Sequence, residues 1–237
     1  MSSRIRRSLA ATLILLGAGA LFWRFPAVDA TAWQEGPPPQ IWAYRQQQEA
    51  TGLLPSHYHY VPLSQVSLDL QLAVLVAEDV GFLQHGALDP GAISEALQAW
   101  WAGHRLRGAS TLSQQLAKNL FTSSVRSAWR KLAELRMAFW LERHLSKARI
   151  FELYLNIIEL GPALYGVDAA AQAFYGTSAA TVTVDQAASL AATIPAPRST
   201  DPRRPNRAHA ARRVAVVERM QRLGFLRQRL NQAAARP

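Results

Sequence analysis

Helical periodicity runs almost without interruption from Ser64 to Gly224, and it constrains the fold more than any other feature of this sequence. Apolar residues recur there at three- and four-residue spacing, whereas the alternation typical of strands is scarce. The chain has 237 residues, of which 49% are hydrophobic and 18% are charged, so it is long enough for one good-sized core and too short for several domains. We therefore expect a mainly α fold in a single domain.

Capping residues predict where several helices begin. Asp89-Pro90 is typical of an N-cap followed by proline at the first helical position, and the helix it starts should run towards Gly103. An earlier helix is expected to carry one apolar stripe, made of Leu68, Leu72, Leu75 and Val76. Further starts are predicted at Ser110-Thr111, Ser124, Ser146 and Thr183, with Gln114 and Gln186 at capping-box spacing from Thr111 and Thr183. A final long helix is predicted from about Asn206 to the residue before Gly224.

Residues 1–33 are predicted to form a membrane anchor. The stretch from Leu9 to Trp23 carries no charge, and arginines precede and follow it. Its fifteen residues fall short of the roughly 20 that span a bilayer, but Arg24 can snorkel and the apolar residues after it can extend the span. A cleaved signal peptide is the alternative. We favour an anchor because Trp23 and Trp33 would suit the exit of a helix at a membrane interface.

The predicted membrane anchor divides the chain into three parts. Residues 1–33 are the cytoplasmic tip and transmembrane anchor, residues 34–60 are a proline-rich tether, and residues 61–237 form the functional domain. The arginines before the anchor should stay in the cytoplasm, so the domain would lie on the periplasmic side of the cell inner membrane. The sequence contains no cysteine, which excludes a disulfide framework, a thiolate zinc site and a cysteine nucleophile.

Positive charge gathers towards the C-terminus. Eleven arginines lie between Arg198 and Arg236, where only Asp201 and Glu218 oppose them, and the whole chain has a formal net charge of +10. Because the domain is expected to be exported, we interpret these arginines as a solvated face near anionic lipid headgroups. Nucleic acid is not an expected partner.

The segment from residue 110 to residue 120 predicts an amphipathic helix with an unusual polar side. Its apolar side is made of Leu112, Leu116, Ala117 and Leu120, and its polar arc of Thr111, Gln114, Gln115 and Lys118. A solvated helix face usually carries Glu, Lys and Arg, whereas a hydroxyl, two amides and one ammonium suit sugar hydroxyls beside a phosphate. An ordinary polar surface is the alternative.

Two carboxylates are candidates for acid–base chemistry. Glu78 ends an apolar helix, so partial burial could raise its pKa, although a residue that merely caps the helix or forms an ion pair is the alternative. Glu134 lies inside a helix, four residues after Arg130, and a simple ion pair between the two is its alternative interpretation. Spacing in the sequence does not show whether Glu78 and Glu134 approach each other.

Four motifs follow one another between Val61 and Gly224. They are Glu78-Asp79-x-x-Phe82-x-x-His85 followed by Asp89, Gly108-Ala109-Ser110-Thr111-Leu112-Ser113-Gln114-Gln115-Leu116-Ala117-Lys118-Asn119, Arg130-Lys131-x-x-Glu134, and Lys147-x-x-Ile150-x-x-x-Tyr154-Leu155-Asn156. In this order and spacing, the chain resembles the peptidoglycan glycosyltransferase family, which includes the polymerase half of class A penicillin-binding proteins. It resembles the members without a transpeptidase domain. One departure is Ala87, where the family usually has glycine two residues after the histidine.

The resemblance implies a lysozyme-like glycosyltransferase lobe with a smaller, membrane-associated lobe beside a cleft. The activity it implies is the polymerisation of lipid II into β-1,4-linked glycan, with inversion at the donor sugar and release of undecaprenyl pyrophosphate. Glu78 would be the general base at the 4-hydroxyl of the acceptor N-acetylglucosamine. Glu134 would be the second acid, acting through a divalent cation or by orienting nearby bases.

The remaining site residues also follow from the resemblance. Lys118 and Arg126 match basic residues that face the donor pyrophosphate. Substrate-binding roles are further expected for Ser110, Thr111, Gln114, Gln115, Asn119, Asp79, Phe82, His85, Arg130 and Lys131. The cofactor that the resemblance allows is a divalent cation, Mg or Mn, at the donor pyrophosphate, and no organic cofactor is expected. Expected partners are lipid II, the growing glycan strand, the membrane, and cell-division or penicillin-binding proteins.

Two other functions stay open at this level. A lysozyme-like hydrolase or lytic transglycosylase would also use acids in a helical lobe, but it would not need the cation Lys118 for a lipid pyrophosphate. A non-catalytic scaffold is the other, and Ala87 is the one residue in its favour. Trp100 and Trp101 are expected to face the membrane interface, since the substrate carries a long lipid tail, although a place in the core is the alternative.

Overall fold

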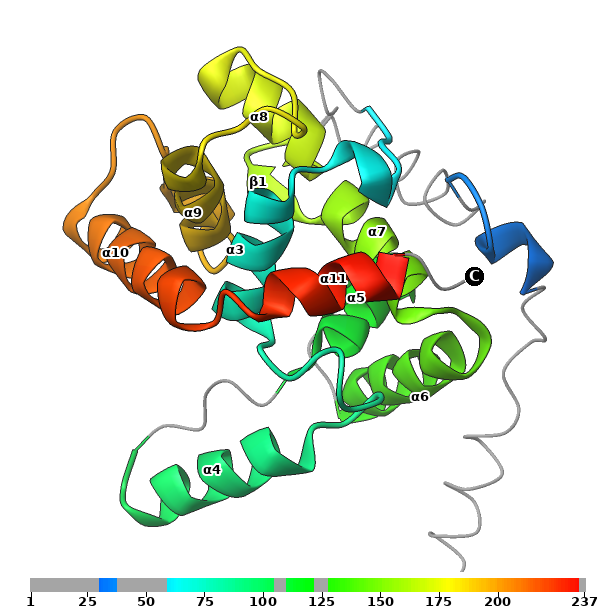
Figure 1. The fold of residues 1–237 in the computed structure, drawn as a ribbon. Coiled ribbons are helices and arrows are strands. Elements are labelled where there is room, and N and C mark those ends of the chain that lie inside the picture. Colours follow the sequence, from blue (N-terminus) through cyan, green and yellow to red (C-terminus); the bar gives the residue numbers. More distant parts are fainter. Residues whose placement is uncertain (1–29, 38–58, 105–109, 122–127, 235–237) are drawn as a thin grey trace, which may run out of the picture.

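The computed structural model describes residues 30–37, 59–104, 110–121 and 128–234, and helices dominate it (Figure 1). The α-helices are α3 (Leu68–Glu78), α4 (Pro90–Trp101), α5 (Leu112–Phe121), α6 (Ala128–His144), α7 (Lys147–Ile157), α8 (Val167–Tyr175), α9 (Val184–Thr193), α10 (Arg207–Arg222) and α11 (Leu226–Ala234). Short 3-10 helices are η1 (Thr31–Trp33), η2 (Leu63–Gln65) and η3 (Pro197–Ser199). An antiparallel hairpin joins β1 (Glu159–Gly161) to β2 (Leu164–Tyr165). The predicted mainly α class is confirmed.

Helix α3 is the central element of the fold. Helices α9, α10 and α11 pack on it, and the residues from Leu70 to Val76 are all buried. The residues of the predicted apolar stripe are buried or packed against the core, and burial extends beyond that stripe because neighbouring helices enclose α3. The enclosure holds the C-terminal end of α3, and hence Glu78, in a fixed position.

The predicted helix starts are confirmed where the structure describes them. Asp89 accepts a hydrogen bond from the backbone N–H of Ala92, and Ser146 caps α7 in the same way. Thr183 and Gln186 form a complete capping box at the start of α9. The predicted start at residue 124 lies outside the described residues. These caps depend on neighbouring residues only, which is why the sequence predicts them well.

The predicted helix that begins near Asn206 is confirmed, but it is not the last one. Asn206 caps α10, and after a break at Gly224 the chain continues as α11. Leu226 and Leu230 are buried, and α11 contacts α3 and α7. These two leucines lie one helical turn apart among polar and basic residues, a pattern that indicates a buried helix face only weakly.

The last residues of the predicted anchor are docked on the domain. Trp33 is fully buried, and its ring stacks on Phe121 at 5.3 Å and meets Trp140 edge-on at 5.6 Å. Arg149 of α7, itself buried, donates from Nε to the Trp33 carbonyl at 2.6 Å. The prediction that Trp33 lies at a membrane interface is therefore wrong, because the ring is enclosed by protein.

The predicted anchor itself falls almost entirely on residues 1–29, outside the described part of the chain. None of the helices within the described ranges is both long and apolar enough to cross a bilayer. The division at residues 33 and 60 stays a prediction.

Helix α4 stands away from the other helices at one end of the molecule (Figure 1). Ala96 is its one buried residue among those described, whereas the side chains of Trp100 and Trp101 are 54% and 80% exposed. The alternative of a core position for these two tryptophans is therefore excluded.

Candidate active site

Glu78 is the last residue of α3, and its half-buried carboxylate lines a cavity of about 490 Å³. The side-chain amide of Gln115 on α5 donates a hydrogen bond to Oε2 of Glu78 at 2.9 Å. Burial raises the pKa of Glu78 above its ordinary value of 4.5, the Gln115 bond lowers it in part, and the nearby charge of Asp79 raises it further. The ionised carboxylate is therefore a stronger base than that of an exposed glutamate.

Tyr154 holds Gln115 in the orientation that serves Glu78. The Tyr154 hydroxyl donates to Oε1 of Gln115 at 3.0 Å, which leaves the amide nitrogen to face the carboxylate. Complete burial, together with the negative charges of Glu78 and Asp79, raises the pKa of Tyr154 well above its ordinary value. Tyr154 therefore remains a hydrogen-bond donor.

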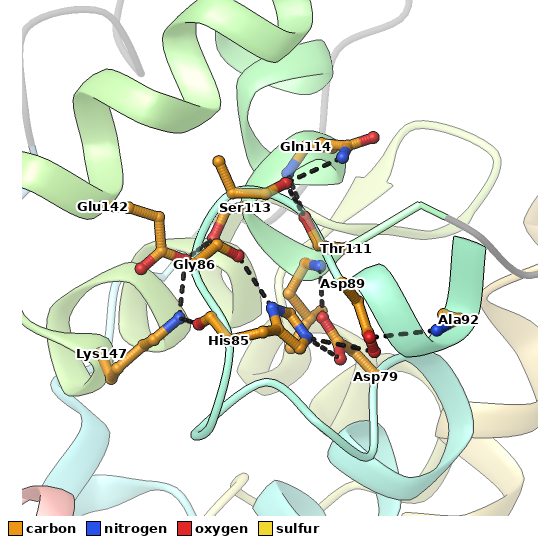
Figure 2. Close-up of polar contacts among 12 residues, drawn as sticks. Asp79, His85, Gly86, Asp89, Ala92, Thr111, Ser113, Gln114, Glu142 and Lys147 are labelled. Atoms are coloured by element: carbon orange, nitrogen blue, oxygen red, sulfur yellow. Dashed lines mark hydrogen bonds and ion pairs between the residues drawn. The ribbon is translucent and has the colours of Figure 1, made fainter. Parts of the chain in front are cut away.

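Asp79 ties the end of α3 to the start of α5 (Figure 2). Its Oδ2 accepts from the backbone N–H of Leu112 at 2.9 Å, and its Oδ1 lies 2.8 Å from Nε2 of His85. The other ring nitrogen of His85 lies 2.8 Å from the carbonyl of Gly86, so both ring nitrogens have partners within the protein. Asp79 and His85, expected at the substrate, are thus occupied by contacts within the protein.

Thr111 and Gln114 turn towards the carbonyl of Ala87. The Thr111 hydroxyl donates to this oxygen at 3.1 Å, and the Gln114 side-chain amide donates at 2.8 Å. Gln114 also accepts a hydrogen bond from Nζ of Lys131 at 3.1 Å. Thr111 and Gln114 thus bind the backbone of Ala87 and make no use of its side chain. Ala87, the residue that departs from the family pattern, therefore occupies an ordinary structural position. Thr111 and Gln114 are buried, and they position α5.

A second network, which the sequence did not predict, holds the loop after α3 (Figure 2). Nζ of Lys147 lies 2.7 Å from Oε1 of Glu142 and 2.5 Å from the carbonyl of His85, and Ser113 donates to the same Glu142 oxygen. The Lys147 ammonium also lies 4.3 Å from the ring centre of Phe82, which is fully buried. Phe82 is thus enclosed within the protein, and its expected role at the substrate stays a prediction.

The basic residues of the third motif surround Glu134. This carboxylate is 2% exposed and lies 3.4 Å from both the Arg130 guanidinium and the Lys131 ammonium. Of the two roles expected for Glu134, the geometry fits the orientation of nearby bases. Glu134 is not among the described residues that line the cavity of Glu78, and its role at the substrate stays a prediction.

The remaining predicted residues lie on α5 or beside it. Lys118 is exposed and Asn119 is half-buried on α5, and Ser110 lines the cavity just before that helix. Arg126 falls in a segment outside the described residues. The prediction of an apolar side for this helix is confirmed, since its four leucine and alanine residues are buried.

The cavity has two charged residues that sequence reasoning missed. Glu95 lines it from α4, and Arg219 lines it from α10. Arg219 lies in the arginine-rich C-terminal segment, where nothing in the sequence distinguishes it from its neighbours. Only the packing of α10 on α3 brings it to the site.

One group of side chains among the described residues has the composition of a metal site. Possible ligand atoms of Asp79, His85 and Asp89 lie within 4.8 Å of one another. Both carboxylate oxygens of Asp79 and both nitrogens of His85 already face partners within the protein, and Asp89 caps α4. These residues therefore do not fit the divalent cation expected at a pyrophosphate, and that cation stays a prediction.

Comparison with known proteins identifies the family. The sequence profile described as Transglycosylase matches residues 47–221. A protein of Methylobacillus flagellatus named biosynthetic peptidoglycan transglycosylase is 45% identical over 162 residues, which cover 68% of this chain and 70% of the relative. Proteins of the same name from Nitrosospira multiformis and Aeromonas hydrophila are 46% and 49% identical over 61% and 59% of this chain, and the matches span 64% and 60% of those relatives, less than two thirds. The chain belongs to the transglycosylase family.

Proposed function

We propose that this chain is a peptidoglycan glycosyltransferase that polymerises lipid II into β-1,4-linked glycan strands and releases undecaprenyl pyrophosphate. Membership of the transglycosylase family and the names of its relatives support glycan polymerisation in cell-wall synthesis. The observation that carries the proposal is the environment of Glu78. Its carboxylate has a raised pKa, a fixed orientation and a place in the wall of a cavity of about 490 Å³, within the usual size of a small-molecule site.

In the proposed reaction, Glu78 acts as the general base. Its carboxylate takes the proton of the acceptor 4-hydroxyl while that oxygen forms a bond to the anomeric carbon of the donor. The bond from this carbon to the pyrophosphate oxygen breaks, and its electron pair leaves with the pyrophosphate. Attack from the face opposite the leaving group inverts the donor carbon. A base whose pKa is raised towards the working pH accepts the proton more readily, which is the physical use of the burial of Glu78.

Cations on α5 and α6 would stabilise the departing pyrophosphate. Lys118 and Lys131 are exposed, and buried Glu134 fixes Lys131 together with Arg130. Fixed cations offset the charge that develops on the leaving group without reorganisation of solvent. Arg126 joins this group by resemblance alone. A divalent cation there is a separate prediction, to be tested by chelation, and no step above uses it.

The membrane is the proposed setting of the reaction, because both substrates carry undecaprenyl tails. The exposed Trp100 and Trp101 on α4 support an interfacial surface at this end of the molecule. We propose that residues 1–33 anchor the chain in the inner membrane with the domain on the periplasmic side. Cell-division and penicillin-binding proteins remain predicted partners.

The direct test is incubation of the purified chain with lipid II in detergent, followed by electrophoretic separation of the products. We expect glycan polymer from the wild type and from Glu218→Gln, which removes an exposed carboxylate on α10. We expect Glu78→Gln to make polymer at least about 10²-fold more slowly. Hydrolysed disaccharide products from the wild type would instead indicate a lysozyme-like hydrolase, and no reaction would favour a scaffold.

A further inference from the structure

The cavity beside Glu78 has an uneven distribution of charge. Its acidic lining residues are Glu78, Asp79, Asp89 and Glu95. Among the lining residues in the described part of the chain, Arg219 alone is basic. Lys118 and Lys131, proposed above to face the donor pyrophosphate, are not in this wall. The described wall of this cavity therefore offers Arg219 as its cation.

Arg219 is fixed in this wall by the end of α3. Its Nη1 donates to the carbonyl of Val76 at 3.2 Å, two residues before Glu78. This carbonyl belongs to the last turn of α3, where helix carbonyls lack the partner that the next turn would supply. Basic side chains are favoured at such negative helix ends, which explains the position of the guanidinium. The bond to Val76 uses only one of the five N–H donors of Arg219.

The other donors of Arg219 have no carboxylate partner in the described structure. Two other arginines do have carboxylate partners: Arg213 on α10 pairs with Asp185, and Arg227 on α11 pairs with Asp69. A guanidinium presents five N–H groups in a planar fork that matches carboxylate and phosphate oxygens. The donors of Arg219 that Val76 does not use can therefore bind an anion that enters the cavity.

We infer that Arg219 determines how the acceptor substrate is oriented, by binding one of its oxyanions. This inference rests on the proposed function. The acceptor hydroxyl must reach Glu78, so the acceptor must occupy this cavity. Its uncharged sugar can contact the acidic wall, whereas its carboxylates or diphosphate would be repelled there. The anion is therefore accepted only at Arg219, and this places the neutral sugar end at the base.

The test measures binding of two probes that do not require turnover. The first is the methyl glycoside of the disaccharide pentapeptide, whose anions are peptide carboxylates. The second is the peptide-free disaccharide 1-diphosphate with its lactyl group as an amide. Calorimetric titration of the full chain in detergent would compare wild type, Arg219→Gln and Arg219→Lys. Arg222→Gln is the matched control, because Arg222 is exposed on the same helix and does not line the cavity.

We expect Arg219→Gln to weaken binding of at least one probe by about tenfold or more, the usual effect of a lost charge-assisted contact. The probe affected identifies which oxyanion is bound. Arg219→Lys should retain most of the affinity, and Arg222→Gln all of it. Glutamine keeps a donor for the Val76 carbonyl, and thermal melting would verify the fold.

Unchanged affinity of Arg219→Gln for both probes would overturn the inference, whether or not its melting temperature falls, since Arg219 would then only cap α3. The proposed function is judged separately. If the wild type makes no polymer from lipid II but loses probe binding with Arg219→Gln, the anion site stands and the proposed function fails. If the wild type makes polymer and probe binding does not change in Arg219→Gln, the proposed function stands and the inference about Arg219 fails.

Discussion

Replacement of Trp33 by alanine should destabilise the whole domain, although this residue was expected at the edge of a membrane anchor. The ring is 0% exposed and packs between Phe121 of α5 and Trp140 of α6. A buried aromatic side chain removes roughly 200 Å² from water, and at about 25 cal/mol per Å² this corresponds to roughly 5 kcal/mol. Alanine still buries part of this surface, so we expect the free energy of unfolding to fall by about 3–5 kcal/mol, within the usual range for such substitutions.

The assay is thermal unfolding of the full chain in detergent, followed by circular dichroism. For a domain of this size, 1 kcal/mol changes the melting temperature by about 2–4 °C, so Trp33→Ala should lower it by roughly 6–20 °C. Trp129→Ala is the matched control, because Trp129 lies on α6 and is 64% exposed, and its effect should stay within about 0.5 kcal/mol. Equal melting temperatures for the two variants would refute the docking of Trp33.

Three further predictions concern the site and the membrane. Because burial raises the pKa of Glu78 and the base must be ionised, kcat/KM should fall on the acid side with a midpoint above 4.5; a pH–rate profile with a midpoint at or below this value would contradict the assignment. Lys118→Ala should lower kcat/KM for lipid II by about 1.5–3 kcal/mol in transition-state stabilisation, and normal turnover would make Lys118 only a surface cation. A chain that begins at Ala30 should still float with liposomes, and Trp100→Glu with Trp101→Glu should abolish this; equal flotation would place the lipid-facing surface elsewhere.

Features of the fold that depend on neighbouring residues could be predicted from the sequence. The caps at Asp89, Ser146 and Thr183 are of this kind, because the side chain that starts each helix bonds to a backbone group three residues away. The burial of Trp33 could not be predicted in the same way. Its partners Phe121 and Trp140 lie far along the chain, and a tryptophan near an apolar segment is equally typical of a membrane interface.

The helical face of α5 could be predicted, but the contacts of its residues could not. Gln115 reaches Glu78, whereas Thr111 and Gln114, on the same arc, turn to the carbonyl of Ala87. Periodicity shows which residues share a face, and only packing decides which neighbour that face meets. The substrate contacts expected from the resemblance for Thr111 and Gln114 therefore remain a prediction, beside structural roles that the geometry explains.

Arg219 shows the same limit of sequence reasoning. In the sequence it is one of eleven arginines near the C-terminus, and charge predicted a solvated face, which agrees with its exposure but does not place it at the cavity. Its distinct position follows from the contact of α10 with α3, which aligns one arginine with the last turn before Glu78. The resemblance located the acid, and the three-dimensional packing located the basic residue beside it.

The most direct test of the central role of Glu78 is the rate of lipid II polymerisation by Glu78→Gln, measured together with its stability. Loss of a general base should reduce turnover by about 10²-fold or more. The pKa of Glu78 is raised in the folded state, so its ionised form lowers stability at neutral pH, and Glu78→Gln should melt at or above the wild-type temperature at pH 7, with the difference vanishing below pH 4.5. A folded Glu78→Gln protein that polymerises lipid II at the wild-type rate would contradict the account.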